Sequence, residues 1–143
     1  MKEKKILTMR SVQEGDEILV QDLFDFGMHA DACRLFVMSC LHDGAIHELF
    51  FVSNVCIGMV SLDHGEISYR MKKAWRGQGF GTQCVALFLQ HNVTEMKARV
   101  EADNAASIAI LKANGFKMND RHENVLYFTR DLQAAGKIAK VGW

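Results

Sequence analysis

The order of apolar and polar residues along the chain predicts six to seven strands and about four helices. Runs rich in β-branched and aromatic residues are typical of strands, and they occur at Lys5–Val12, His47–Val52, Val55–Leu62, Glu66–Met71, Lys97–Glu101, Phe116–Met118 and Val125–Asp131. Apolar residues at helical spacing predict helices from Glu17, over about Ala30–Leu41, through Cys84 towards Asn92, and from Asn104 to Asn114.

The connections between these elements predict the topology of the sheet. The chain contains no proline, so its turns are predicted from glycine, asparagine and aspartate. Turns at 53–54 and 63–65 join three consecutive strands into an antiparallel meander. A strand–helix–strand unit over 66–101 then pairs its strands in parallel, with a right-handed crossover, and a last hairpin turns at 119–124. The order β-α-α-β-β-β-α-β-α-β-β describes an α/β (α+β) fold with a mixed central sheet.

Length and composition favour one domain over 1–143, with a core at 5–132 and a tail at 133–143. The 143 residues can bury one core, and 49% apolar with 24% charged residues is an ordinary globular composition. Seventeen basic and seventeen acidic side chains cancel, so net charge favours neither nucleic acid nor a membrane surface as a partner. No apolar run approaches the roughly 20 residues that cross a bilayer, and the charged start does not resemble a signal peptide. The expected location is cytoplasmic.

The four cysteines, Cys33, Cys40, Cys56 and Cys84, are widely spaced among apolar neighbours. They form no C-x-x-C pair, and the histidines are scattered without metal-ligand spacing. We therefore expect buried thiols and no metal site.

A glycine-rich segment connects a predicted strand to the predicted helix that follows it. Its sequence is Arg76-Gly77-Gln78-Gly79-Phe80-Gly81-Thr82. The first turn of a helix has N–H groups without an internal partner and carries partial positive charge. Glycine lets the backbone approach a phosphate closely and take positive φ. The segment predicts a diphosphate site, although glycines in this pattern also occur in ordinary turns.

A second motif follows, in which Asn104 opens a helix that ends at a C-cap signal before Phe116. Together the two motifs resemble those of the GNAT superfamily, the acyl-CoA-dependent N-acyltransferases. The R/Q-x-x-G-x-G/A signature of that family is matched by Arg76, Gly79 and Gly81. Its second signature, an asparagine that opens a helix ending in Gly-Phe, is matched by Asn104, Gly115 and Phe116. Ser107 and Leu111 look most like the branch that acetylates the N-termini of ribosomal proteins.

The resemblance implies the GNAT fold from Lys5 to Leu132, with acetyl-CoA as the co-substrate. In this family the strand before the loop and the strand after the helix splay apart, and the pantetheine arm of coenzyme A lies in the gap. A bulge in the first strand frees backbone groups that bind the arm, and two short helices near the N-terminus commonly wall the acceptor site. The implied cofactor-binding residues are Met71 and Lys73, through their backbone, and Arg76, Gly77, Gln78, Gly79, Phe80, Gly81, Thr82, Asn104 and Ser107.

Acyl transfer to an amine needs a neutral amine and a leaving thiolate that is protonated or stabilised. Glu66 aligns with the strand glutamate that acts as base in the histone-acetylating branch, so it is the predicted general base, with Glu101 as the alternative. Many relatives have a tyrosine at the position of Leu111 that protonates the thiolate, which leucine cannot do. Tyr127 is the candidate for that role, with Tyr69 as an equal alternative. Each of these side chains has a structural interpretation as well.

The predicted function is transfer of an acetyl group from acetyl-CoA to a primary amine, by direct attack in a ternary complex. The alternative is a non-catalytic acyl-CoA-binding or sensing domain of the same fold, which the leucine at position 111 favours. A dinucleotide site is disfavoured, because no long parallel sheet and no first-strand G-x-G-x-x-G with a downstream acid are predicted. The acceptor could be a small molecule, a protein N-terminus or a lysine side chain. A homodimer is common in the family.

Overall fold

The structure is a computed structural model that describes residues 6–24 and 29–131. Its centre is a seven-stranded mixed sheet in the order β1-β2-β3-β4-β5-β7-β6. The strands are β1 (Leu7–Ser11), β2 (Ile46–Val52), β3 (Val55–Asp63), β4 (Glu66–Met71), β5 (Met96–Glu101), β6 (Lys117–His122) and β7 (Val125–Arg130). The helices are α1 (Glu17–Val20), α2 (Ala30–His42), α3 (Phe80–His91) and α4 (Ala105–Ala113), with a short 3-10 helix, η1 (Lys73–Trp75). The predicted fold class and order of elements are confirmed.

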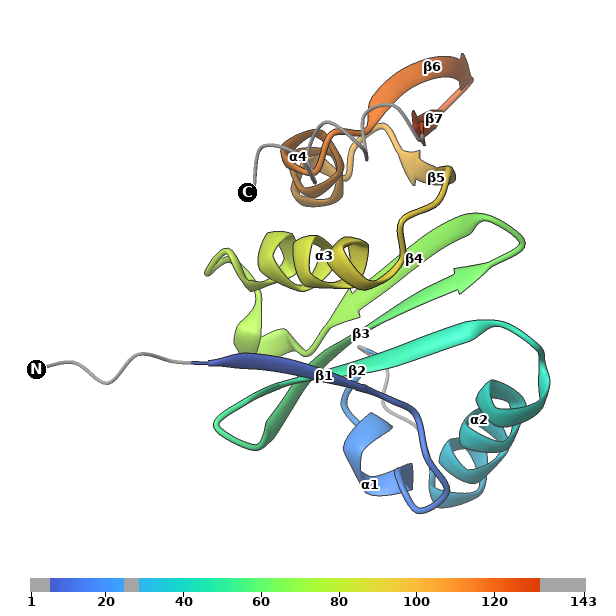
Figure 1. The fold of residues 1–143 in the computed structure, drawn as a ribbon, viewed down its shortest axis with the longest axis vertical. Coiled ribbons are helices and arrows are strands. Elements are labelled where there is room, and N and C mark those ends of the chain that lie inside the picture. Colours follow the sequence, from blue (N-terminus) through green and yellow to red (C-terminus); the bar gives the residue numbers. More distant parts are fainter. Residues whose placement is uncertain (1–5, 25–28, 132–143) are drawn as a thin grey trace, which may run out of the picture.

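The two faces of the sheet are covered by different helices, as Figure 1 shows: α1 and α2 lie on one face, and α3 and α4 on the other. Adjacent strand residues point to opposite faces, and Leu49 and Phe50 in β2 are both fully buried because each faces one of the two helix layers. We call these the α1/α2 face and the α3/α4 face. All four cysteines are buried, as predicted.

Two tight turns form the predicted meander of β2, β3 and β4. Ser53 and Asn54 have φ of 50° and 66°, and His64 and Gly65 have φ of 51° and 79°. Two consecutive residues with positive φ match the right-handed twist of a hairpin. The register that follows runs without interruption from Asp63 opposite Glu66 to Gly58 opposite Met71. The bulge expected in this strand from the family resemblance is therefore absent, and that expectation was wrong.

β4 and β5 are parallel, as predicted, but their register consists of one pair, Glu66 opposite Lys97. The Lys97 N–H donates to the Gly65 carbonyl at 2.9 Å. Beyond this point the strands diverge, while β5 continues in an antiparallel register with β7 from Met96 opposite Arg130 to Glu101 opposite Val125. The predicted splay is therefore confirmed, and the open edge of β4 arises from this divergence.

The last hairpin differs from the prediction. β6 extends to His122, and the turn is formed by Glu123 and Asn124, with φ of 53° at Glu123. Every side chain of β6 is exposed, so the strand has no apolar alternation that would reveal its length. The single-domain assignment stays a prediction, and the tail at 133–143 lies outside the described residues. None of the described helices has the length and apolar character that crossing a membrane requires.

Candidate active site

The N-terminus of α3 is open. Its N-cap residue is Gly79, with φ 84° and ψ 0°, and no side chain caps the helix. The N–H of Gln83 makes a helical bond to the Gly79 carbonyl, at 3.3 Å. The N–H groups of 79–82 precede that donor, so the helix itself offers them no acceptor. This arrangement suits an anion, because these donors and the helix dipole act at the same point.

The glycines of the loop have two different roles. Gly77 and Gly79 have φ of 73° and 84°, and beyond their chain neighbours no atom lies within 4 Å of the position that a Cβ would occupy. These two glycines are required by the backbone conformation, and the space before them is open. Gly81 is in the helix, where a Cβ would lie 2.7 Å from Cδ1 of Ile110. Gly81 therefore allows α3 and α4 to approach closely.

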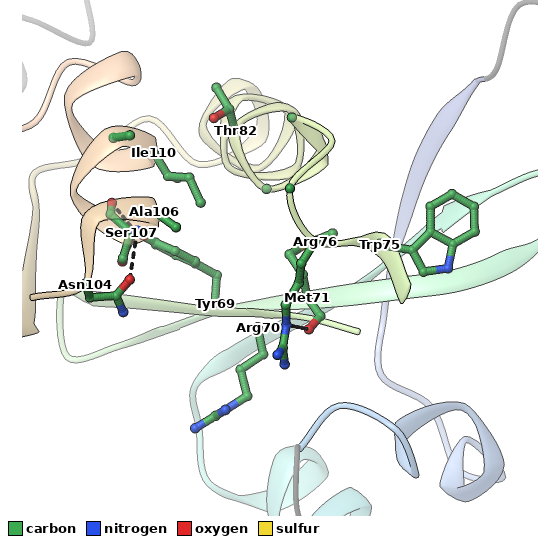
Figure 2. Close-up of a pocket in the computed structure, with 14 residues that line it drawn as sticks. Tyr69, Arg70, Met71, Trp75, Arg76, Thr82, Asn104, Ala106, Ser107 and Ile110 are labelled. Atoms are coloured by element: carbon green, nitrogen blue, oxygen red, sulfur yellow. Dashed lines mark hydrogen bonds between the residues drawn. The ribbon is translucent and has the colours of Figure 1, made fainter. Parts of the chain in front are cut away.

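Side chains hold the loop against the end of β4. Arg76 donates from Nε to the Met71 carbonyl at 3.0 Å (Figure 2). Gln78 donates from Nε2 to the Ala74 carbonyl at 3.0 Å, and Phe80 contacts Trp75 edge to face with ring centroids 5.3 Å apart. The side chains of Gln78 and Phe80 are thus engaged in the loop itself, and a contribution of these two residues to a ligand would come from their backbone.

α4 is capped at both ends by the residues that the sequence predicted. The Oδ1 atom of Asn104 accepts the Ser107 N–H at 3.0 Å, which is an N-cap bond. At the other end, Gly115 has φ of 84°, and the Phe116 N–H donates to the Leu111 carbonyl at 3.0 Å, as in a Schellman motif.

Tyr69 connects β4 to α4 across the gap. Its hydroxyl lies 2.7 Å from Oγ of Ser107 and donates to the Ser107 carbonyl at 3.1 Å. Burial raises the pKa of the Tyr69 phenol, while the hydrogen bond to Ser107 opposes this shift. The phenol is therefore protonated at neutral pH and has a proton to give.

These elements enclose a cavity of about 480 Å³ between β4, the glycine loop, α3 and α4 (Figure 2). Eight of the predicted cofactor residues line it: Met71, Arg76, Gly77, Gly79, Gly81, Thr82, Asn104 and Ser107. The other residues that line it are Tyr69, Arg70, Trp75, Ala106, Ala109 and Ile110. Ala106 and Ala109 lie on the side of α4 that lines this cavity. Their spacing in the sequence could have predicted this side of α4 as part of the site, because small residues allow a ligand to approach a helix.

The backbone of β4 presents donors to the same gap. In an antiparallel pair, alternate residues bond to the partner strand and the residues between them point their N–H and C=O groups away from it. The Lys72 N–H donates to the Ile57 carbonyl in β3 at 2.8 Å. Counting back from Lys72, the N–H groups of Met71 and Tyr69 are directed away from β3, to the side where β5 has diverged. The Met71 carbonyl on this side accepts from Arg76.

Three more predicted site residues, Glu66, Lys73 and Tyr127, do not line this cavity, and neither do the alternative base Glu101 and the core residue Leu111. Lys73 lines a second cavity. Both carboxylate oxygens of Glu66 bind Arg99, at 2.5 and 3.1 Å. Tyr127 lies opposite Arg99 in β7, with its ring 5.9 Å from that of His122, and it does not line either described cavity. Leu111 is 1% exposed in the core.

The cysteines are poor candidates for covalent chemistry. Burial raises the pKa of the Cys84 thiol to about 12 and that of Cys40 to about 11, so both are thiols rather than reactive thiolates at neutral pH. Within residues 6–24 and 29–131, no cluster of three or more histidine, cysteine, aspartate or glutamate side chains is arranged to hold a metal ion.

The open helix terminus lies beside a cleft at the point where β4 and β5 diverge, an arrangement that suits an anionic ligand. Residues 28–117 match the Acetyltransferase (GNAT) domain family, and the chain belongs to this family. The family predicted from the two motifs is confirmed, and with it the class of enzyme, an acetyltransferase of the GNAT type. No curated protein sequence matches the chain significantly.

Solved structures share the whole fold at low identity. One is the spermidine N-acetyltransferase from Vibrio cholerae in complex with CoA and spermine, with a TM-score of 0.75, 15% identity, and 90% of this chain and 97% of that chain covered. A second is RimL, the ribosomal L7/L12 alpha-N-protein acetyltransferase in complex with coenzyme A. Its TM-score is 0.73 and its identity 20%, and the match covers 90% of this chain and 95% of that chain. A third is an N-acetyltransferase from Staphylococcus aureus Mu50. Its TM-score is 0.72 and its identity 13%, and the match covers 89% of this chain and 99% of that chain. These likenesses show the fold, and the branch of the family stays a prediction.

Proposed function

We propose that the chain transfers the acetyl group of acetyl-CoA to a primary amine by direct attack in a ternary complex. The observation that carries this proposal is the open N-terminus of α3, which faces a cavity that continues along the diverging edge of β4. The diphosphate of coenzyme A would bind the N–H groups at 79–82. The pantetheine arm would lie along β4, and Asn104 and Ser107 of α4 form the opposite wall.

The gap contains candidates for two of the groups that the reaction needs, a donor to the oxyanion and an acid for the leaving thiolate. The amine nitrogen attacks the thioester carbon, so that a C–N bond forms and the C–S bond breaks. The N–H of Tyr69 or Met71, directed away from β3, would stabilise the oxyanion. We propose Tyr69 rather than Tyr127 as the group that protonates the departing thiolate, because Tyr69 lines the cavity and carries its proton at neutral pH.

We retain Glu66 as the proposed base for the amine. Its side chain points to the α1/α2 face, opposite the face of Ile67 and Tyr69, so it can meet an amine that approaches from the side away from α3. Arg99 is exposed over 62% of its side chain, and ion pairs that are exposed to solvent are held only weakly. Acceptor binding would therefore have to displace Arg99 before Glu66 can take a proton, directly or through water.

The charge on Glu66 gives a first test. We expect Glu66→Gln to lower kcat about 100-fold, as for the loss of a general base. The measurement is steady-state release of free coenzyme A thiol across pH. Full activity with the wild-type pH profile would show that Glu66 is only the ion-pair partner of Arg99.

The cofactor site is tested by titrating the protein with acetyl-CoA by calorimetry, with NAD and ATP as controls. We expect Gly79→Glu to weaken acetyl-CoA binding by at least about tenfold, because it strains a positive φ and places a carboxylate at the helix N-terminus. Gly44→Glu is the matched control, since Gly44 also has positive φ (77°) and open space, and it does not line either described cavity. Equal binding by both variants would contradict the diphosphate site. Binding without thiol release with any amine would support the sensing alternative.

A further inference from the structure

We propose that a second cavity, on the α1/α2 face beside the end of β4, binds the acceptor and selects amines that carry a carboxylate or phosphate group over polyamines. This inference rests on the proposed acetyl transfer, because it names the acceptor class of that reaction. It does not use Glu66 as the base, since six residues of extended chain, about 20 Å, separate Glu66 from Lys72. The cavity has a volume of about 480 Å³, and its lining includes Asp22, Phe24, Cys56, Lys72, Lys73 and Trp75. A volume of this size suits a small molecule.

The second cavity lies across the sheet from the main body of the first. Tyr69 and Met71 pack with the α3/α4 face, so Arg70 and Lys72, which alternate with them along the extended chain, point to the α1/α2 face. Cys56, at the start of β3, belongs to the cluster on that same face. A donor bound along α3 and α4 and an acceptor bound under α1 and α2 would thus approach β4 from opposite sides.

The two cavities meet at two residues. Trp75 lines both of them. Arg70 lines the first, and its guanidinium lies 4.6 Å from the ring centroid of Phe24, which lines the second. A ternary complex requires donor and acceptor sites that share a border, and this border lies beside the edge of β4 that β5 has left open.

The charge at this border is positive. Among the described residues that line the two cavities, the cations Arg70, Lys72 and Lys73 are accompanied by one carboxylate, that of Asp22. Among the described residues these four side chains form no ion pair with any partner, so the cations are not neutralised. Burial raises the pKa of the Cys56 thiol, against the effect of Lys72, so this thiol adds no negative charge at neutral pH.

A surplus of cations attracts an anionic group and repels a polycation. The aromatic rings of Phe24 and Trp75 provide apolar walls for the carbon skeleton of the same molecule. The acceptor that fits is therefore a small amine with an anionic group at one end and an apolar part that contacts these rings.

Matched pairs of amines test this inference by the rate of thiol release from acetyl-CoA. Phenylalanine is compared with phenylethylamine, which lacks only the carboxylate, and 2-aminoethyl phosphate with ethanolamine, which lacks only the phosphate. Spermidine is the polycation. We expect the anionic member of at least one pair to react with a kcat/KM about tenfold higher or more, as for the gain of one charge-assisted contact. The pair that responds distinguishes a carboxylate from a phosphate.

A charge reversal at Lys72 tests whether the preference for anionic amines arises in this second cavity. Lys72→Glu should raise the KM of the anionic amine about tenfold or more and leave the acetyl-CoA dissociation constant unchanged. Lys117→Glu is the control, because Lys117 is an exposed lysine on β6 that does not line either described cavity. A KM that the two variants change equally would overturn the assignment to this cavity.

Binding is followed separately through Trp75. The chain has two tryptophans, so Trp143→Phe leaves Trp75 as the sole reporter of fluorescence changes on adding each amine with coenzyme A present. If acetyl-CoA binds but spermidine reacts best, or no anionic amine either reacts or changes the fluorescence, the acceptor inference is overturned and the cofactor site stands. If acetyl-CoA does not bind, the proposed function fails, and the acceptor inference fails with it.

Discussion

Tyr69 shows how much depends on the face to which one side chain points. Ile67, Tyr69 and Met71 face the α3/α4 side of β4, where the cavity lies. Tyr127 has neighbours, Leu126 and Phe128, that are buried in the same cluster, so Tyr127 itself faces the other way. The two tyrosines were equivalent in the sequence, and the alternation of side chains along each strand separates them.

Replacing Tyr69 by phenylalanine removes the phenolic proton and keeps the ring. We expect kcat to fall between about 10-fold and 100-fold, as for loss of a general acid, with little change in the KM of acetyl-CoA. Since burial raises the pKa of this phenol above its ordinary value of 10.0, the wild-type enzyme should lose this contribution only as the pH rises above 10.0. Steady-state kinetics across pH measure both effects. Tyr127→Phe is the matched control, and a greater loss in that variant would reverse the assignment.

The contact between α3 and α4 depends on Gly81. A Cβ there would lie 2.7 Å from Cδ1 of Ile110 and 3.6 Å from Cγ of Met71. We expect Gly81→Val to lower the free energy of unfolding by about 1 kcal/mol, at the low end for overpacking, because Cδ1 of Ile110 can turn towards the cavity that both residues line; urea denaturation measures it. Adding Ile110→Ala should recover part of this loss, because the smaller side chain makes room. Strict additivity of the two changes would show that they do not share a contact.

Elements that are determined by local chemistry were predicted well. The limits of α4 follow from Asn104 and Gly115, which cap its ends, and the hairpin turns follow from short polar segments. The length of β6 and the 3-10 turn at Lys73–Trp75 were not predicted. β6 is paired by its backbone while all its side chains are exposed, so its sequence contains no apolar pattern to detect.

The candidate site was predicted in part, for a related reason. The loop and the start of α4 are contiguous segments that act through their backbone, so their residues could be named directly from the sequence. Arg70 and Trp75 were missed, because whether they face the cavity depends on the register of β4 and on the course of the chain after it. The ion pair of Glu66 with Arg99 depends on the alignment of two strands that are distant in the sequence.

For the molecule as a whole, stability in acid should depend on Asp16. This buried carboxylate at the start of α1 binds both Nη atoms of Arg10 in β1, at 2.8 and 2.9 Å. The hydrogen bonds from Arg10 hold the pKa of Asp16 below its ordinary value of 3.8. The carboxylate of Asp16 therefore binds a proton more readily in the unfolded chain than in the folded one. Its contribution to the free energy of unfolding is complete well above pH 3.8, and it is lost as the pH falls from there towards the lower pKa of the folded state.

We expect Arg10→Gln to reduce the free energy of unfolding by about 2 kcal/mol at neutral pH, since it removes charged hydrogen bonds from a buried carboxylate. The difference from wild type should shrink as the pH is lowered below 3.8. Urea denaturation at several pH values measures it. Arg34→Gln is the control, because the pair of Arg34 with Asp31 is exposed and 3.7 Å long. A loss that does not change with pH would contradict the role of Asp16.

The single strand pair between β4 and β5 also bears on how the chain opens. It divides the backbone hydrogen-bond network into β1–β4 and β5–β7–β6, and regions joined by few bonds tend to open as separate cooperative units. A pantetheine arm in the gap would take the position of the strand pairs that are absent there. The two halves already share one core with α3, so a bound cofactor would add a backbone link between them, and the amide protons along the open edge of β4 should exchange more slowly while it is bound.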